Sequence, residues 1–187
     1  MRALAVLAAC LLLAGCGGGH STATRAGTAT RPAAAATTTG AALQGTGYSL
    51  RLPAGWRDAS REDTGLSSAP DLVVAATDPP AVTLVTRDRQ PANVSAADLL
   101  RTLRRSEVDR QGVRGASAAA PIAVSGARGV TYHYDTTSDA GVKLRTRQVV
   151  VIHGRTAYTI ALTTPVDSFA AADPEFGAIL ASWRWTG

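Results

Sequence analysis

The stretches ARGVTYHYD at residues 127–135, VKLRTRQVVVI at 142–152 and TAYTIALT at 156–163 decide the fold of this 187-residue chain. Each is rich in the β-branched and aromatic residues that favour strands. The short connection between the first two stretches contains SDAG at 138–141, and the connection between the last two contains HG at 153–154. Strands joined by so few residues pair with their sequence neighbours in the antiparallel sense. The three stretches therefore predict the centre of an antiparallel sheet.

Further strands are predicted on the N-terminal side of this centre. The sequence YSLRL at 48–52 alternates between polar and apolar residues and stops at Pro53. Two apolar runs at 72–76 and 82–86 are separated by Asp-Pro-Pro at 78–80, which is typical of a turn between neighbouring strands. We therefore expect these runs to form a hairpin that extends the sheet.

Two helices are predicted among the strands. Ser95 is a suitable N-cap with Asp98 three residues later, and Gly112 would end this helix. Asp173 is a suitable N-cap for the last helix, with Pro174 at its first position. The order of strands and helices predicts an α+β fold in which helices pack on an antiparallel sheet.

The N-terminus carries an apolar run at residues 3–13, followed by the sequence Leu13-Ala14-Gly15-Cys16. The run is well short of the ~20 residues that cross a bilayer as a helix. It is typical of an export signal. The tetrapeptide resembles the lipobox of bacterial lipoproteins, which implies attachment of diacylglycerol to the Cys16 thiol and cleavage before this residue. The alternative is an ordinary secretory signal whose cleavage region contains a cysteine.

The segment after the lipobox differs in composition from the rest of the chain. Residues 17–46 consist mainly of Gly, Ala, Thr and Ser and include no acidic residue. Such a sequence buries too little apolar area to offset its ordering entropy, so it is predicted to be disordered. We therefore expect a lipoprotein signal peptide at 1–15, a lipidated cysteine with its tether at 16–46, and a globular domain at 47–187.

The residue content argues against several kinds of chemistry. Cys10 would leave with the signal peptide and Cys16 would carry the lipid, so no thiol would remain for a disulfide, a nucleophile or a metal. His133 and His153 lack the spacing of metal ligands, and no Gly-x-Ser-x-Gly motif is present. We expect no metal, no cofactor and no enzymatic activity.

Nucleic acid is an improbable partner for this domain. The whole chain has 19 basic and 14 acidic residues, but three of the basic ones precede residue 47. The domain is therefore left with 16 basic and 14 acidic residues, which is far from the strong positive charge of a nucleic-acid binder.

For the oligomeric state of the protein, we expect a monomer.

Two predicted neighbouring strands place charged side chains on one face. Alternation puts His133 and Asp135 together, and it puts Lys143, Arg145 and Arg147 together. A turn centred near residue 139 would place His133 opposite Arg145 and Asp135 opposite Lys143. We call these five residues the polar row: His133, Asp135, Lys143, Arg145 and Arg147. The row is mostly cationic and could hold an anionic group; the alternative is an ordinary solvated sheet face with cross-strand pairs.

Three stretches of the domain resemble PsbP-like domains. YSLRLPAGW at 48–56 is similar to their first strand, which ends in Pro-x-Gly-Trp, and TAYTIAL at 156–162 is similar to a late strand of their sheet. Residues 176–185 resemble the closing helix and its Ser-Φ-Arg tail. Together with the lipobox, the chain resembles the LpqN/DcrB-type bacterial lipoproteins over residues 47–187. This implies a PsbP-like α/β/α sandwich. Members of this superfamily are largely accessory binding proteins, including a photosystem subunit and a small nuclear-import factor.

The sequence thus predicts an extracytoplasmic lipoprotein, anchored to the cell membrane through Cys16, that acts as a non-catalytic binding or accessory module. Two acyl chains on one residue give stable membrane attachment. The expected partner is an unknown envelope protein or a cell-wall or lipid component. Two alternatives remain open: a carrier of a lipid or other apolar ligand in a cavity between sheet and helix, and an envelope hydrolase that uses His133 with Asp135.

Overall fold

A computed structural model of the chain describes residues 38–62, 69–108 and 113–186. The predicted signal peptide, the lipobox with Cys16 and most of the expected tether lie outside these residues. The predicted end of the first helix at Gly112 lies outside them as well. None of the described helices is long and apolar enough to cross a membrane.

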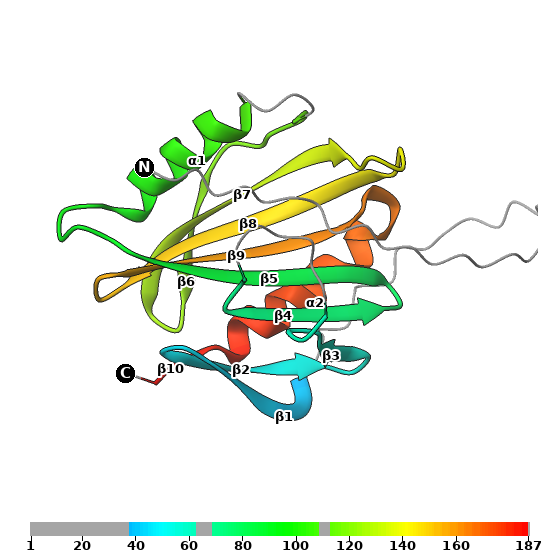
Figure 1. Cartoon of the computed structure of the whole chain (residues 1–187), viewed down its shortest axis with the longest axis horizontal. Helices are drawn as coiled ribbons and strands as arrows, with labels where there is room; N and C mark the ends of the chain where they lie inside the picture. Colours follow the sequence, from blue (N-terminus) through cyan, green and yellow to red (C-terminus); the bar gives the residue numbers. More distant parts are fainter. Residues whose placement is uncertain (1–37, 63–68, 109–112, 187) are drawn as a thin grey trace, which may run out of the picture.

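The larger of two sheets has seven strands in the order β3-β4-β5-β9-β8-β7-β6, and every neighbouring pair is antiparallel (Figure 1). The prediction of an antiparallel sheet centred on three consecutive C-terminal strands is confirmed. The strands are β3 (Trp56–Asp58), β4 (Leu72–Thr77), β5 (Pro80–Arg89), β6 (Ala120–Val124), β7 (Ala127–Thr137), β8 (Lys143–His153) and β9 (Thr156–Pro165).

The smaller sheet has the order β1-β2-β10, with β1 at Thr38–Gly45, β2 at Tyr48–Pro53 and β10 at Arg184–Trp185. The predicted domain boundary at residue 47 is therefore too late, because Thr38–Gly45 was assigned to the disordered tether. This stretch is ordered by its partner and not by its own composition. It pairs antiparallel with β2, and Leu43 packs against the main core.

A polar network fixes the small sheet to the large one at the turn between β1 and β2. Asp71, which precedes β4, accepts hydrogen bonds from the backbone N–H of Thr46 (3.0 Å) and from the Arg87 Nε (2.8 Å). The Tyr158 hydroxyl donates to the Thr46 carbonyl oxygen (3.2 Å). Asp71, Arg87 of β5 and Tyr158 of β9 therefore converge on this turn.

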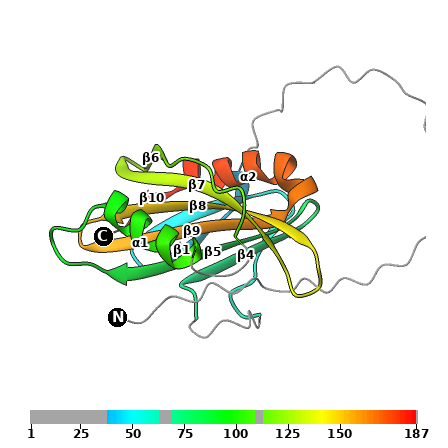
Figure 2. The ribbon, with the colours of Figure 1, turned by 90° about the horizontal axis from the view of Figure 1, so that it is seen from above.

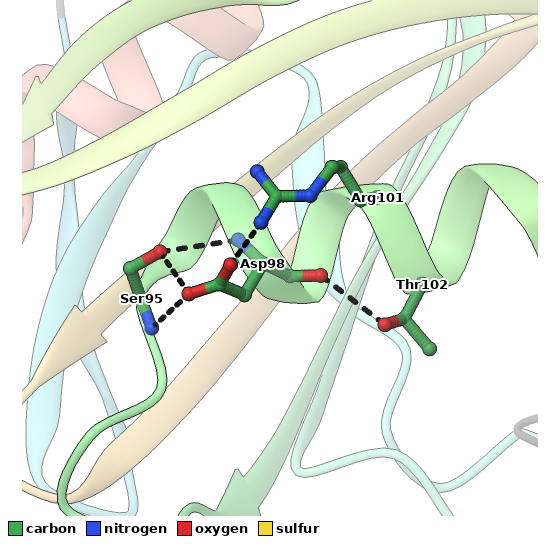
Figure 3. A network of polar contacts seen from close by, with 4 residues as sticks. All are labelled: Ser95, Asp98, Arg101 and Thr102. Carbon is green, nitrogen blue, oxygen red and sulfur yellow. Dashed lines mark hydrogen bonds and ion pairs between the residues drawn. The ribbon is translucent and has the colours of Figure 1, made fainter.

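Helix α1 (Ala96–Val108) and helix α2 (Phe169–Ser182) lie on opposite faces of the large sheet (Figure 2). The predicted N-cap of α1 is confirmed. Ser95 and Asp98 form a reciprocal capping box, in which the backbone N–H of Ser95 donates to Asp98 Oδ2 (3.0 Å) and the backbone N–H of Asp98 donates to Ser95 Oγ (3.1 Å). Figure 3 shows this network together with Arg101, which forms an ion pair with Asp98.

Helix α2 begins five residues earlier than predicted. A short 3₁₀ turn at Val166–Ser168 leads directly into Phe169, so Pro174 lies inside the helix and not at its first position. Proline removes one backbone N–H from the helix, and the carbonyl left without it belongs to Ala170, which is exposed to solvent. Asp173 lies inside the helix and therefore does not cap it; its carboxylate is paired with a side chain of the sheet.

The main core lies between the large sheet, α2 and the small sheet. Its largest fully buried side chain is Trp183, whose ring stacks on that of Tyr48 with the centroids 4.0 Å apart. Gly45 lies against this stack, since a Cβ atom at Gly45 would be 2.1 Å from Cζ of Tyr48. A separate cluster beneath α1 contains Leu100 and Tyr132.

Candidate functional site

The register of β7 and β8 differs from the predicted one. His133 lies opposite Arg147, Asp135 opposite Arg145, and Thr137 opposite Lys143. The predicted pairs of His133 with Arg145 and of Asp135 with Lys143 are therefore wrong by two residues. Because side chains alternate with a period of two, the shift keeps all five residues of the polar row on one face.

The cause of the shift is the length of the turn between the two strands. The backbone N–H of Ser138 donates to the Val142 carbonyl (2.9 Å), and that of Gly141 donates to the Ser138 carbonyl (2.8 Å). Gly141 has a positive φ of 79°, which favours glycine. Val142 is thus part of the turn, where it is 45% exposed, and β8 begins one residue later than predicted.

Arg145 is held by a carboxylate and an aromatic ring. Its Nε and Nη2 donate to Oδ1 (2.6 Å) and Oδ2 (2.8 Å) of Asp135, so the pair is bidentate. Its guanidinium carbon lies 5.4 Å from the centre of the Phe169 ring at the start of α2. The hydrogen bonds from Arg145 lower the pKa of the Asp135 carboxyl below its usual value, and the same contact raises the pKa of Arg145.

Arg147 is also held by a carboxylate and an aromatic ring, both of which come from α2. Its Nη1 donates to Oδ1 of Asp173 (2.8 Å), and its Nε donates to Oγ1 of Thr131 (3.4 Å). Its guanidinium carbon lies 5.6 Å from the centre of the Phe176 ring. Arg147 therefore connects β7, β8 and α2, and the polar row lies on the α2 side of the sheet.

His133 lies in the row between the strand and the helix. Its ring centre is 6.2 Å from that of Phe169. Its backbone N–H donates to Oγ of Ser117 (3.0 Å), and the Ser117 N–H donates to the His133 carbonyl (2.9 Å). The Ser117 hydroxyl in turn donates to the carbonyl of Ala118 (3.1 Å). This hydroxyl is thus occupied by backbone groups, which is not the arrangement of a serine activated by a histidine base.

Lys143 is the exposed member of the row, and it forms no salt bridge with any residue that the structure describes. Among the same described residues, no group of three or more His, Cys, Asp or Glu side chains is placed to hold a metal ion. The row is therefore a fixed set of charged groups with one free lysine at its end.

Sequence reasoning missed the contribution of α2 to this site. Phe169 and Phe176 pack against the two arginines, and Asp173 pairs with one of them. Because Asp173 is followed by proline, the sequence indicated a helix start at this residue. Its ion pair with Arg147 on β8 was therefore not predicted. The spacing of Phe169, Asp173 and Phe176 by three and four residues places them on neighbouring positions of one helix face, which was the available signal.

Comparison with solved structures identifies the architecture. The cyanobacterial PsbP protein CyanoP from Synechocystis aligns with a TM-score of 0.57 and 16% identity, over 85% of this chain and 98% of that chain. LpqN, described as involved in cell envelope biogenesis of Mycobacterium tuberculosis, aligns with a TM-score of 0.55 and 15% identity, over 75% of this chain and 83% of LpqN. The Saccharomyces cerevisiae Ran-binding protein Mog1p aligns with a TM-score of 0.53 and 13% identity, over 80% and 96%.

No family model and no curated protein match the sequence itself. The likeness is thus one of architecture: antiparallel sheets carry two packed helices in the arrangement that these three solved proteins share. The expectation of an α+β sandwich is confirmed, and the chain has the PsbP-like fold.

Proposed function

We propose that this chain is a lipid-anchored protein on the outer face of the cell membrane that binds an envelope partner without catalysing a reaction. The observation that carries the proposal is the sequence Leu13-Ala14-Gly15-Cys16 directly after an apolar run of export-signal length. A diacylglycerol group on Cys16 would hold the protein on the membrane stably, whereas a single acyl chain would not.

The fold supports a binding role. LpqN, which has this fold, is described as involved in cell envelope biogenesis, and Mog1p, which also has it, is a Ran-binding protein. In the present chain the two arginines of the polar row, Arg145 and Arg147, each form an ion pair and lie over an aromatic ring. Charges that are fixed in this way are suited to recognise a partner, because little side-chain entropy is lost on binding.

The position of β1 sets how far the domain reaches from the membrane. Strand β1 begins at Thr38, about twenty residues after Cys16. If these residues are disordered, as their composition predicts, they span roughly 25 Å on average. The domain would therefore stay within about one of its own diameters of the bilayer. A partner in the membrane or in the adjacent envelope layer is within reach.

The experiment that tests the anchor is metabolic labelling of the full chain with an alkyne analogue of palmitate, followed by membrane fractionation. The expected result is label and membrane association for the natural sequence, and neither for Cys16→Ser. Gly15→Ala, which keeps a small residue in the lipobox, should retain both. Label on the Cys16→Ser chain, or its unchanged membrane fractionation, would overturn the proposed anchor.

The binding role is tested by a photo-crosslinking residue placed at Gly177 on α2. A Cβ atom at this position meets nothing within 4 Å, so a larger side chain there points into open space. The matched control carries the same residue at Arg105, which is exposed on α1 on the opposite face. We expect one reproducible adduct from Gly177 in whole cells and none from Arg105. Absence of an adduct at Gly177 would contradict binding at this face.

A further inference from the structure

The two arginines of the polar row each keep one terminal amino group unused. Arg145 donates through Nε and Nη2, which leaves Nη1 without a hydrogen-bond partner among the described residues. Arg147 donates through Nε and Nη1, which leaves Nη2 without one among the same residues. Each unused group offers two N–H donors from a planar, permanently charged guanidinium.

Both guanidinium groups are held in place before any ligand arrives. A carboxylate fixes one edge of each group, and a phenyl ring of α2 lies beside it at a cation–π distance. The side chain of Arg145 is 31% exposed and that of Arg147 is 23% exposed, so both are recessed but reachable. Donors that are already fixed in the free protein favour binding, because their side chains lose little further conformational entropy when a ligand binds.

The spacing of the arginines matches that of an extended polypeptide. Arg145 and Arg147 are two residues apart on β8, so their Cα atoms are separated by roughly 6.7 Å. Side chains at alternate positions of any extended segment repeat at the same distance. Two carboxylates at alternate positions of such a segment can therefore meet both arginines at once, with Lys143 one step further along the same row.

The helix leaves room beside the row. Gly177 lies one turn after Asp173 on α2, so both occupy the same flank of the helix. Asp173 reaches the sheet and pairs with Arg147, whereas a Cβ atom at Gly177 would meet nothing within 4 Å. Figure 2 shows that α2 lies on the opposite face of the large sheet from α1. The flank next to Arg147 is therefore open.

The balance of charge in the row favours an acidic partner. Three cations, Lys143, Arg145 and Arg147, stand against the two carboxylates of Asp135 and Asp173. The excess is positive, and it is carried by the exposed lysine and by the unused edges of the arginines. The aromatic rings beside them lower the local hydration, which strengthens a charge-assisted hydrogen bond.

From these observations we infer that the polar row binds an extended acidic segment of a partner protein, with carboxylates at alternate positions received by Nη1 of Arg145 and Nη2 of Arg147. The inference rests on the proposed binding function and names its partner. A membrane surface fits the site less well, because the arginines are recessed and a planar layer of headgroups contacts protruding side chains. A narrow chain can enter beside α2.

The test uses the full-length chain in a non-ionic detergent and a fluorescent peptide of alternating glutamate and threonine, about twelve residues long. The matched peptide has the same composition with its glutamates in adjacent pairs. Fluorescence anisotropy should show that the alternating peptide binds roughly tenfold or more tightly than the paired one. Equal affinity for the two peptides would overturn the inference.

Variants separate guanidinium geometry from charge alone. Arg145→Lys and Arg147→Lys keep the positive charge. A lysine ammonium that pairs with the aspartate, however, has no second, rigidly placed donor group to offer to a ligand. Each should weaken binding of the alternating peptide about tenfold. Arg101→Lys is the matched control, because Arg101 is also paired with an aspartate but lies on α1. If Arg101→Lys weakens binding equally, or if the lysine variants bind unchanged, the inference is wrong.

Two further probes, inorganic polyphosphate and vesicles of phosphatidylglycerol, test the competing ligands. Tighter binding of either one than of the alternating peptide would overturn the assignment of an acidic protein segment. This inference can fail while the proposed function stands. An adduct at Gly177 together with no preference for the alternating peptide would overturn the inference and leave the binding role in place. Loss of both results would remove both.

Discussion

Nη1 of Arg147 lies 2.8 Å from Oδ1 of Asp173, and this contact ties strand β8 to helix α2 across the α2 face of the large sheet. Neither side chain is fully buried, with 23% and 32% of their surfaces exposed. Arg147 also packs on Phe176, a fully buried residue of the same helix. The pair thus contributes both to the packing of α2 and to the candidate site.

Removal of this contact should destabilise the fold moderately. Arg147→Ala is expected to lower the free energy of unfolding by about 1–2 kcal/mol, since an ion pair and a cation–π contact are lost together. Urea denaturation measures the change. A double-mutant cycle with Asp173→Ala should give a coupling energy of about 0.5–1 kcal/mol, and a coupling of zero would show that the pair contributes nothing.

The Asp135–Arg145 pair should make stability depend on pH in the acid range. Hydrogen bonds from Arg145 lower the pKa of Asp135 in the folded state, so the unfolded state binds a proton at a higher pH than the folded state does. The stabilisation is therefore fully present above the unfolded-state pKa of about 4 and is lost as the pH falls through the folded-state pKa.

The measurement is the free energy of unfolding of the natural chain and of Asp135→Asn between about pH 6 and pH 2. The natural chain should lose more stability than the variant as the pH falls. Asp139→Asn removes the same charge from the exposed turn between β7 and β8 and controls for net charge. Parallel curves for the natural chain and Asp135→Asn would contradict this prediction.

Gly45→Ala should destabilise the junction of the two sheets. The added Cβ would lie 2.1 Å from Cζ of Tyr48, which is fully buried and stacked on Trp183. The strand or the ring must shift, at a cost of about 1–3 kcal/mol. Gly177→Ala is the control, because its Cβ meets no atom within 4 Å and alanine is favoured over glycine in a helix by up to about 1 kcal/mol.

Thermal unfolding should therefore move in opposite directions for the two glycine variants, with a lower midpoint for Gly45→Ala and an equal or higher one for Gly177→Ala. Near-ultraviolet circular dichroism should also change for Gly45→Ala, because the environment of Trp183 is altered. If Gly45→Ala is as stable as the natural chain, the close approach of Tyr48 to this strand is not required by the fold.

The capping box of α1 should have a measurable energy. Ser95→Ala removes the oxygen that accepts a hydrogen bond from the Asp98 N–H, and the expected loss is about 1 kcal/mol. Ser168→Ala is a matched control at the N-cap of α2, where the serine side chain makes no capping hydrogen bond. Amide hydrogen exchange in α1 should accelerate for Ser95→Ala alone; equal exchange in both variants would contradict the capping role.

The parts of the fold that sequence predicted are those with strong periodicity. Strands β7, β8 and β9 are ten or eleven residues long and alternate over part of their length, and their short connections determine that they pair antiparallel. Strand β1 lacks this pattern: Leu43 is its one large apolar residue, and its glycines and alanines are disfavoured in strands. Its order comes from the edge of β2, a long-range partner that composition does not reveal.

The candidate site was predicted only in part for a related reason. Alternation gave the correct face for His133, Arg145 and the other members of the row, but it does not fix how many residues a turn contains. The hydrogen bonds of Ser138 with Val142 and Gly141 place the centre of the turn one residue later than predicted, which shifts every cross-strand partner by two residues. The contribution of Asp173 was hidden because a local helix-start pattern explained it equally well.

The order β1-β2-β10 has a practical consequence for labelling the protein. Thr38 pairs with Pro53 at one end of β2, whereas Trp185 pairs with Tyr48 at the other end, roughly 17 Å away. The C-terminus therefore emerges at the edge remote from the point where the chain enters the fold. A fluorescent protein fused after Gly187 would therefore be attached away from the end of β2 at which strand β1 begins.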